Sequence, residues 1–167
     1  GKWHLGWNWK DANGKTTTRL KAVDFSKPTS GGPVDRGFDH YYGDDVPNWP
    51  PYVWINDHKT VGIPSASKPK EMFGSPGPML PGWTLEPVLP EITRRSVQFI
   101  KEKAKTDKPF FLFFPMTSPH TPIAPAKEFQ GKSGISPYAD FLIETDWCVG
   151  QVLQALDQRI VIGAGED

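Results

Sequence analysis

The chain has 167 residues, and its 19 basic and 19 acidic side chains give a formal net charge of +0. This balance gives no indication of nucleic acid or of an anionic membrane surface as a partner, so any anion site must be local. No apolar run is long enough to span a bilayer. The length suits one domain that can bury a core. Cys148 is the only cysteine, so the chain can form no internal disulfide.

Residues 1–26 are expected to form an amino-terminal strand and a turn. The first nine residues alternate, with tryptophans and Leu5 on one parity and Lys2 and His4 on the other. If this segment is extended, Lys2 and His4 project from the same face. Lysine is a permanent cation and an imidazole can donate a proton near neutral pH. The pair is a candidate anion site, and the alternative is a surface lysine beside a packed histidine.

Residues 27–90 hold most of the 18 prolines and show no helical periodicity, which predicts a long loop region rich in proline and aromatic residues. Gly37–Gly43 contains three aromatic rings, and Trp49, Tyr52 and Trp54 follow it. These rings either pack within the loop region, which is the commoner outcome, or stack on a sugar or aryl group. His40 and His58 lie in this region and are interpreted as solvated residues outside any site.

Residues 91–158 are expected to form a helix, a strand and a second helix. Pro90 suits the first turn of a helix that runs to Lys105, with a buried stripe of Ile92, Ser96, Phe99, Ile100 and Ala104. Phe110–Phe114 is a continuous apolar run, which predicts a strand buried on both faces of a mostly parallel sheet flanked by helices. In open α/β sheets ligands bind beyond the carboxyl ends of the strands, where this order puts His120.

The second helix is predicted from Ser136, as its amino-terminal cap, to about Gln158. Its expected buried stripe is Tyr138, Leu142, Thr145, Val149, Val152 and Leu156. Cys148 lies beside this stripe and is interpreted as a buried structural thiol, not as a nucleophile. Asp146 is either a buried acceptor or part of a solvated face. In the tail, 159–167, a short β-branched run could begin another strand.

Lys2, His4 and His120 together supply the groups that a tetrahedral anion needs. A sulfate ester requires fixed positive charge and hydrogen-bond donors on several sides, and its leaving oxygen benefits from a nearby proton donor. No HExxH, GxSxG, Walker or dinucleotide glycine motif is present. The residues alone therefore indicate an α/β domain with a possible anion pocket.

Four segments, in order, resemble the sulfatase family. Gly1–Gly6 reads GKWHLG and resembles the second sulfatase signature, and Gly37–Gly43 resembles the GFDxxYG segment that follows it. Pro109–Pro122 is similar to the family's buried strand and SPHxP segment, and residues 129–153 continue in the same order. The resemblance covers most of the chain and is strongest to arylsulfatase-like enzymes.

The resemblance implies an alkaline-phosphatase-like α/β fold and hydrolysis of sulfate esters through a formylglycine nucleophile beside a calcium ion. By position, Lys2 resembles the lysine that contacts the nucleophile and the sulfate, and His4 the histidine that hydrogen-bonds the formylglycine hydrate. His120 resembles the histidine that binds the sulfate and protonates the leaving oxygen. The resemblance also implies a secreted, periplasmic or lysosomal protein whose substrate is a small sulfate ester or a sulfated glycan.

Three family motifs are not matched by this sequence. The family's Cys-x-Pro-x-Arg segment, which yields formylglycine, is expected upstream of Gly1, and so is an acidic pair that helps hold calcium. Glu166 and Asp167 match the downstream metal ligands too poorly to be assigned, so no metal ligand is predicted here. The chain is expected to carry part of the sulfate pocket and to be inactive alone. The alternatives are a noncatalytic product that binds an anion or a partner protein, and a phosphate or phosphonate ester hydrolase of the same superfamily.

Overall fold

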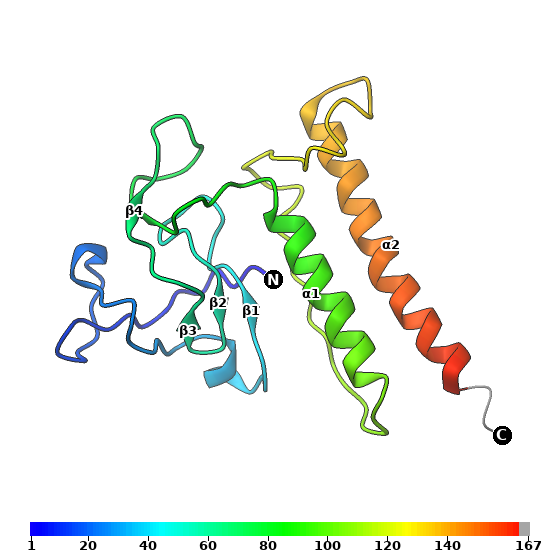
Figure 1. Cartoon of the computed structure of the whole chain (residues 1–167), viewed down its shortest axis with the longest axis horizontal. Coiled ribbons are helices and arrows are strands. Elements are labelled where there is room, and N and C mark those ends of the chain that lie inside the picture. Colours follow the sequence, from blue (N-terminus) through cyan, green and yellow to red (C-terminus); the bar gives the residue numbers. More distant parts are fainter. Residues whose placement is uncertain (164–167) are drawn as a thin grey trace. The chain divides into compact units, whose positions relative to one another are not determined.

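A computed structural model describes residues 1–163, with the side chains up to residue 158. The chain forms two compact units, Gly1–Leu85 and Glu86–Asp167 (Figure 1), and each is treated by itself. Within the described part, no helix is both long and apolar enough to cross a membrane. The expected division into segments stays a prediction, as does a single sulfatase domain over the whole chain.

The first unit contains two small antiparallel sheets. The strands β1 (Tyr42–Gly43), β2 (Ile55–Asn56) and β3 (Lys59–Thr60) pair in that order, and β4 (Ala66–Ser67) pairs with β5 (Pro78–Met79). Two short 3-10 helices, η1 (Leu20–Ala22) and η2 (Pro33–Arg36), precede the strands. The region predicted as a long loop is therefore ordered by short pairings, and the described sheets are not the parallel sheet that the sequence predicts.

Aromatic packing forms the core of the first unit. Trp9, Tyr41 and Ile55 are buried, and Trp7 lies 5.4 Å from the Tyr41 ring between centroids. Tyr52 is also fully buried, and Trp54 stacks on Tyr42 with centroids 5.5 Å apart. The packing interpretation is thus confirmed for these rings of the loop region, because aromatic side chains bury large apolar areas where regular structure is scarce. Trp49, in contrast, is exposed.

Two glycines of the Gly37–Gly43 segment have separate structural roles. Gly37 ends η2 with a φ of 98°, a left-handed conformation that costs glycine little. Gly43 lies against the amino-terminal backbone, and a Cβ atom at this position would come within 1.7 Å of the Gly1 carbonyl oxygen. The amino-terminal segment can therefore reach β1 only because position 43 has no side chain.

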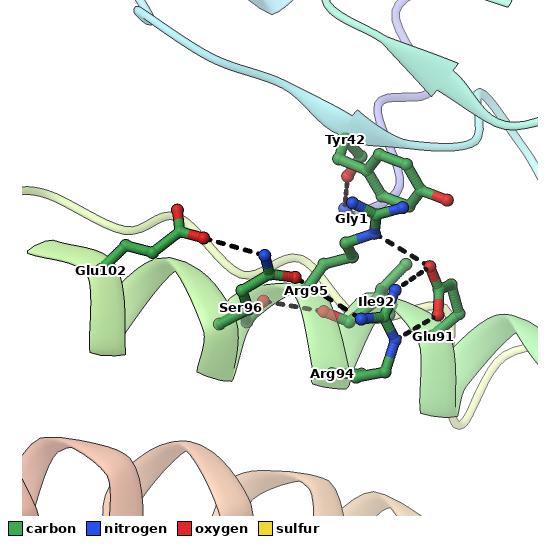
Figure 2. Close-up of polar contacts among 9 residues, drawn as sticks. Gly1, Tyr42, Glu91, Ile92, Arg94, Arg95, Ser96 and Glu102 are labelled. Atoms are coloured by element: carbon green, nitrogen blue, oxygen red, sulfur yellow. Dashed lines mark hydrogen bonds and ion pairs between the residues drawn. The ribbon is translucent and has the colours of Figure 1, made fainter. Parts of the chain in front are cut away.

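Two helices dominate the second unit. Helix α1 (Val88–Lys103) confirms the predicted first helix, and Ile92, Ser96 and Ile100 are buried as expected. Glu91 in its first turn forms ion pairs with Arg94 and Arg95 at 2.7 and 2.9 Å (Figure 2). Figure 1 shows that α1 and α2 run in the same direction, with the connecting segment returning alongside α1; Phe110 in that segment packs edge-on against Phe99 of α1 at 5.4 Å.

Helix α2 (Pro137–Gly163) begins as predicted, because the Ser136 hydroxyl accepts a hydrogen bond from the Ala139 N–H at 3.2 Å. Its predicted buried face is wrong. The predicted stripe members Tyr138, Leu142 and Val149 are exposed and Thr145, Val152 and Leu156 are only half-buried. The buried side chains that the structure describes on α2 are Asp140, Phe141, Glu144, Cys148 and Ala155. A buried stripe that contains a carboxylate cannot be found by counting apolar residues. The predicted strand in the tail is also wrong, because the helix continues through it to Gly163.

The predicted buried strand at Phe110–Phe114 is not observed. The segment has no regular secondary structure, and it belongs to neither of the described sheets. Phe111 is 76% exposed and Phe113 is 59% exposed, whereas Phe110, Leu112 and Phe114 are half-buried. An apolar run becomes a doubly buried strand only when strands flank it and other layers cover it. The described sheets of this chain, which lie in the first unit, do not provide those strands.

A buried carboxylate links α2 to the connecting segment within the second unit. Glu144 is completely buried, and its Oε2 atom accepts a hydrogen bond from the Ala126 N–H at 2.9 Å. Its other carboxylate oxygen, Oε1, has no hydrogen-bond partner among the described residues. Burial raises the pKa of Glu144 from 4.5 to about 7, the bond from Ala126 lowers it, and the charge of Glu128 raises it. Glu144 therefore takes up a proton more readily than an exposed glutamate.

Replacing Ile100 by alanine should destabilise the second unit. Ile100 is fully buried on α1, so Ile100→Ala removes apolar contacts and leaves a cavity, at a cost of about 2–5 kcal/mol in unfolding free energy. Urea unfolding followed by circular dichroism measures this loss. The matched control is Ile63→Ala, because Ile63 is 50% exposed and its truncation should change stability by no more than about 0.5 kcal/mol. Equal effects of the two substitutions would contradict the burial of Ile100.

Replacing Glu144 by glutamine should remove part of the pH dependence of stability. Between pH 4.5 and about 7 the folded protein keeps the Glu144 proton, whereas the unfolded chain releases it. Stability from this group is therefore fully present at low pH and falls as pH rises through that window. Compared with the unsubstituted protein, Glu144→Gln should be relatively more stable at pH 8 than at pH 5, as measured by urea unfolding. Glu86→Gln, which changes an exposed glutamate, should give the same difference at both pH values.

Candidate functional site

The amino-terminal segment of the first unit lies along Asp44 and Asp45. Lys2 forms a parallel bridge with Asp44, and the Trp3 N–H donates to the Asp44 carbonyl oxygen at 3.2 Å. The His4 N–H donates to the Asp45 carbonyl oxygen at 3.1 Å. The Tyr41 hydroxyl lies 2.7 Å from the Gly1 carbonyl oxygen and 2.5 Å from that of Asp44. These bonds hold the backbone that carries Lys2 and His4.

The extended conformation that the sequence predicts for Lys2 to Trp9 breaks at His4. His4 has a φ of 62°, in the left-handed region that non-glycine residues rarely adopt. The next residue, Leu5, is 77% exposed, although it shares a parity with the buried Trp9. Lys2 and His4 both lie in the amino-terminal segment whose backbone pairs with Asp44 and Asp45. They are not placed on one face by a regular strand. His4 is exposed and Lys2 is half-buried.

Two carboxylates beside Lys2 and His4 escaped the sequence analysis. Asp44 is 2% exposed, and neither of its carboxylate oxygens makes a hydrogen bond to another residue that the structure describes. Burial raises the pKa of Asp44 to about 7, while the charge of Lys2 lowers it. Burial also raises the pKa of Asp45, against the opposing effects of the His4 amide and imidazole. The sequence feature that could have identified them is their position as an acidic pair directly after the Gly37–Gly43 segment.

His120 lies in the second unit, in the segment that leads towards α2. Its side chain is exposed, and its Nδ1 atom is 2.6 Å from the Thr121 carbonyl oxygen. Because a carbonyl oxygen can only accept, Nδ1 must carry a proton in this hydrogen bond. Nε2, the nitrogen on the far side of the ring, takes no part in this hydrogen bond.

The structure thus brings together two of the three predicted site residues. Lys2 and His4 share the first unit, and His120 belongs to the second; one site containing all three stays a prediction. His40 and His58 lie near carboxylates instead, with Nδ1 to Oδ2 distances of 3.9 Å to Asp57 and 3.8 Å to Asp35.

The described residues do not fit the calcium ion or the formylglycine that the family resemblance implies. Among them, no group of three or more histidine, cysteine or acidic side chains is arranged to hold a metal ion. Cys148 is fully buried on α2, and burial raises the pKa of its thiol to about 11, which confirms a structural thiol. Asp146 is exposed, as its solvated interpretation predicts. Glu166 and Asp167 lie outside the described residues.

Comparison with known proteins assigns the chain to a family. The sequence model of the family described as Sulfatase matches residues 1–160. An N-acetylgalactosamine-6-O-sulfatase of Bacteroides thetaiotaomicron is 29% identical over 94% of this chain and 36% of its own length. Canine N-acetylgalactosamine-6-sulfatase is 30% identical over 77% of this chain and 24% of its own length, and human arylsulfatase H is 38% identical over 44% and 13%.

The chain therefore spans about a third or less of the length of these relatives. The match nevertheless runs over nearly all of this chain and includes Lys2, His4 and His120. It also covers α1 and all but the last residues of α2. The segments that suggested the resemblance are thus parts of one continuous similarity, and the chain belongs to the sulfatase family, whose members are sulfuric ester hydrolases.

Proposed function

We propose that this chain forms part of the sulfate-binding pocket of a sulfuric ester hydrolase, with Lys2, His4 and His120 as its residues. The observation that carries the proposal is the family match over residues 1–160, a range that includes these three residues. The substrate would be a small sulfate ester or a sulfated glycan. The names of the arylsulfatase and N-acetylgalactosamine-6-sulfatase relatives support both classes.

His120 has the geometry of a group that donates to a sulfate ester. Its Nδ1–H bonds to the Thr121 carbonyl oxygen, so only the imidazolium form, which carries a proton on Nε2 as well, can donate to a sulfate oxygen or to the leaving oxygen. Because the side chain is exposed, a substrate can reach it. Protonation of the leaving oxygen lowers the barrier to breaking its bond to sulfur, since an alkoxide is a poor leaving group.

The neighbours of Lys2 and His4 make anion binding dependent on protonation. An ionised Asp44 beside Lys2 would repel a sulfate group and cancel the lysine charge. Burial opposes that ionisation and raises the pKa of Asp44 to about 7. Below that pH the proposed site therefore keeps the positive charge of Lys2, which suits a tetrahedral anion.

A complete catalytic centre requires groups beyond these residues. Calcium and formylglycine supply Lewis acidity and the nucleophile in the family, and the described residues of this chain fit neither. We therefore assign to Lys2, His4 and His120 only the binding of sulfate oxygens and the protonation of the leaving oxygen. The compartment proposed from the family is secreted, periplasmic or lysosomal.

The proposed fold of the complete domain is the alkaline-phosphatase-like α/β fold with a mostly parallel sheet. Two exposed apolar surfaces of the second unit support it. One consists of Phe111 and Phe113, and the other is an exposed α2 stripe made of Tyr138, Leu142, Val149 and Leu153, which differs from the stripe that the sequence predicts. Exposed apolar surface of this extent is unusual unless another element covers it. In the proposed fold, Phe110–Phe114 would pair as a central strand and the α2 stripe would pack on the sheet.

A polypeptide limited to residues 1–167 should show no measurable hydrolysis of an aryl sulfate, with or without added calcium. The reason is that its described residues offer neither a metal-binding cluster nor an accessible thiol. The assay is release of the phenol from a chromogenic aryl sulfate. Turnover that increases with calcium would show that the residues of this chain suffice for catalysis.

His120→Ala in the full-length protein should lower kcat for an aryl sulfate by about 10²- to 10⁴-fold, the usual contribution of a general acid. The melting temperature should change little, because the side chain is exposed. The control is His40→Ala, which alters another exposed histidine and should leave turnover unchanged. A large loss of stability with unchanged turnover would identify His120 as a packing residue. Preferred turnover of a phosphate ester would favour the superfamily's phosphate hydrolases instead.

A further inference from the structure

Three neighbouring side chains of α2 hold the segment that carries His120. Going back along the helix, Thr145 contacts Ser118, Glu144 accepts from Ala126, and Asp140 accepts from Gly131 and Ser133. The order is antiparallel: as the helix position decreases from 145 to 140, the contacted position in the connecting segment increases from 118 to 133. A single helix face therefore fixes residues 118–133 at successive points.

The first contact lies two residues before His120. The Thr145 Oγ1 atom is 2.7 Å from the Ser118 Oγ atom and also 2.7 Å from the Phe141 carbonyl oxygen. The threonine hydroxyl has one proton and the carbonyl can only accept. Thr145 therefore donates to Phe141, and the Ser118 hydroxyl donates to Thr145. This arrangement fixes the Thr145 rotamer on the helix and leaves its oxygen aimed at Ser118.

The second and third contacts use carboxylates that accept backbone N–H groups. Glu144 is fully buried and bonds to the Ala126 N–H at 2.9 Å. Asp140 is also buried and bonds to the N–H groups of Gly131 and Ser133 at 2.7 and 2.8 Å. Hydrogen bonds from Ser133 and Gly131 lower the pKa of Asp140. Breaking such bonds leaves a buried polar group unsatisfied, which is costly.

Among the residues that the structure describes, no side chain of α2 forms a comparable hydrogen bond with His120 itself, whose Nδ1 bond goes to the adjacent residue Thr121. A bond to an adjacent residue orients the ring relative to the local backbone only. The position of the imidazole in the unit then depends on what holds that backbone. The nearest contact to α2 in sequence is the Ser118–Thr145 pair.

We propose that Thr145 is a positioning residue that holds His120 in place for its reaction through its contact with Ser118. Glu144 supports this role through its hydrogen bond from the Ala126 N–H. The inference rests on the proposed function of His120 and extends it to residues that touch no substrate. Their effect is on alignment: a displacement of about 1 Å at a reacting group can cost about 10²-fold in rate. Substrate affinity depends on the pocket as a whole and should change much less.

The test compares Thr145→Val with Thr145→Ser in the full-length protein. Valine has the same shape without the hydroxyl, so kcat for an aryl sulfate should fall by about tenfold or more with less than about a threefold change in KM. Serine keeps the oxygen and should restore most of kcat. The control is Thr106→Val, which removes a hydroxyl that bonds to the Lys103 carbonyl oxygen at a helix end and should leave kcat unchanged.

A second measurement guards against a general loss of structure. Ser118→Ala removes the same contact from the other side, so the double variant with Thr145→Val should lose no more kcat than either single variant. Amide hydrogen exchange should quicken in residues 118–126 of both single variants and not in α1. Additive losses of kcat, or unchanged kcat with faster exchange, would overturn the positioning role. If His120→Ala leaves turnover intact, the proposed function fails, while the exchange result still reports on the contact itself.

Discussion

The second unit depends on a carboxylate that is buried where an apolar side chain would be expected. Glu144 lies on the inner face of α2 between Phe141 and Cys148, and its bond to Ala126 ties the connecting segment to the helix. An isolated carboxylate in such a place is expensive, so the site tolerates it by shifting its pKa upward and by the bond from Ala126. An apolar side chain at position 144 could also fill this space, but it would leave the Ala126 N–H without a hydrogen-bond acceptor.

This constraint explains why the sequence predicts both helices correctly but predicts the wrong buried face for α2. Pro90 lies in the first turn of α1, which begins at Val88, and Ser136 caps α2. A fixed φ and a capping hydroxyl are local chemistry, which is readable from sequence. The buried face of α2 is set by contacts with residues far away in the chain, such as Ala126. Of the stripe that the sequence predicts to be buried, Tyr138, Leu142 and Val149 are exposed in this chain.

The same distinction applies to Phe110–Phe114 and to the candidate site. An apolar run indicates that burial of the segment is favourable, whereas strand formation requires partner strands elsewhere in the chain. Lys2, His4 and His120 could be chosen from residue types and motif positions, because the chemistry of an anion site needs those groups. Asp44 and the three anchoring side chains of α2 could not, since their importance arises from burial and from hydrogen bonds that no spacing rule encodes.

The formal charge of the sequence is a poor guide to the charge of the proposed pocket. With both side chains ionised, the formal charges of Lys2 and Asp44 sum to zero, so the pair would not attract an anion. Burial of Asp44 raises its pKa to about 7, so below that pH the carboxyl is mostly protonated and the lysine charge remains. Gly43 makes this burial possible, because without a side chain it lets the amino-terminal backbone close over β1. A backbone position with no functional group thus helps to set the electrostatics of the site.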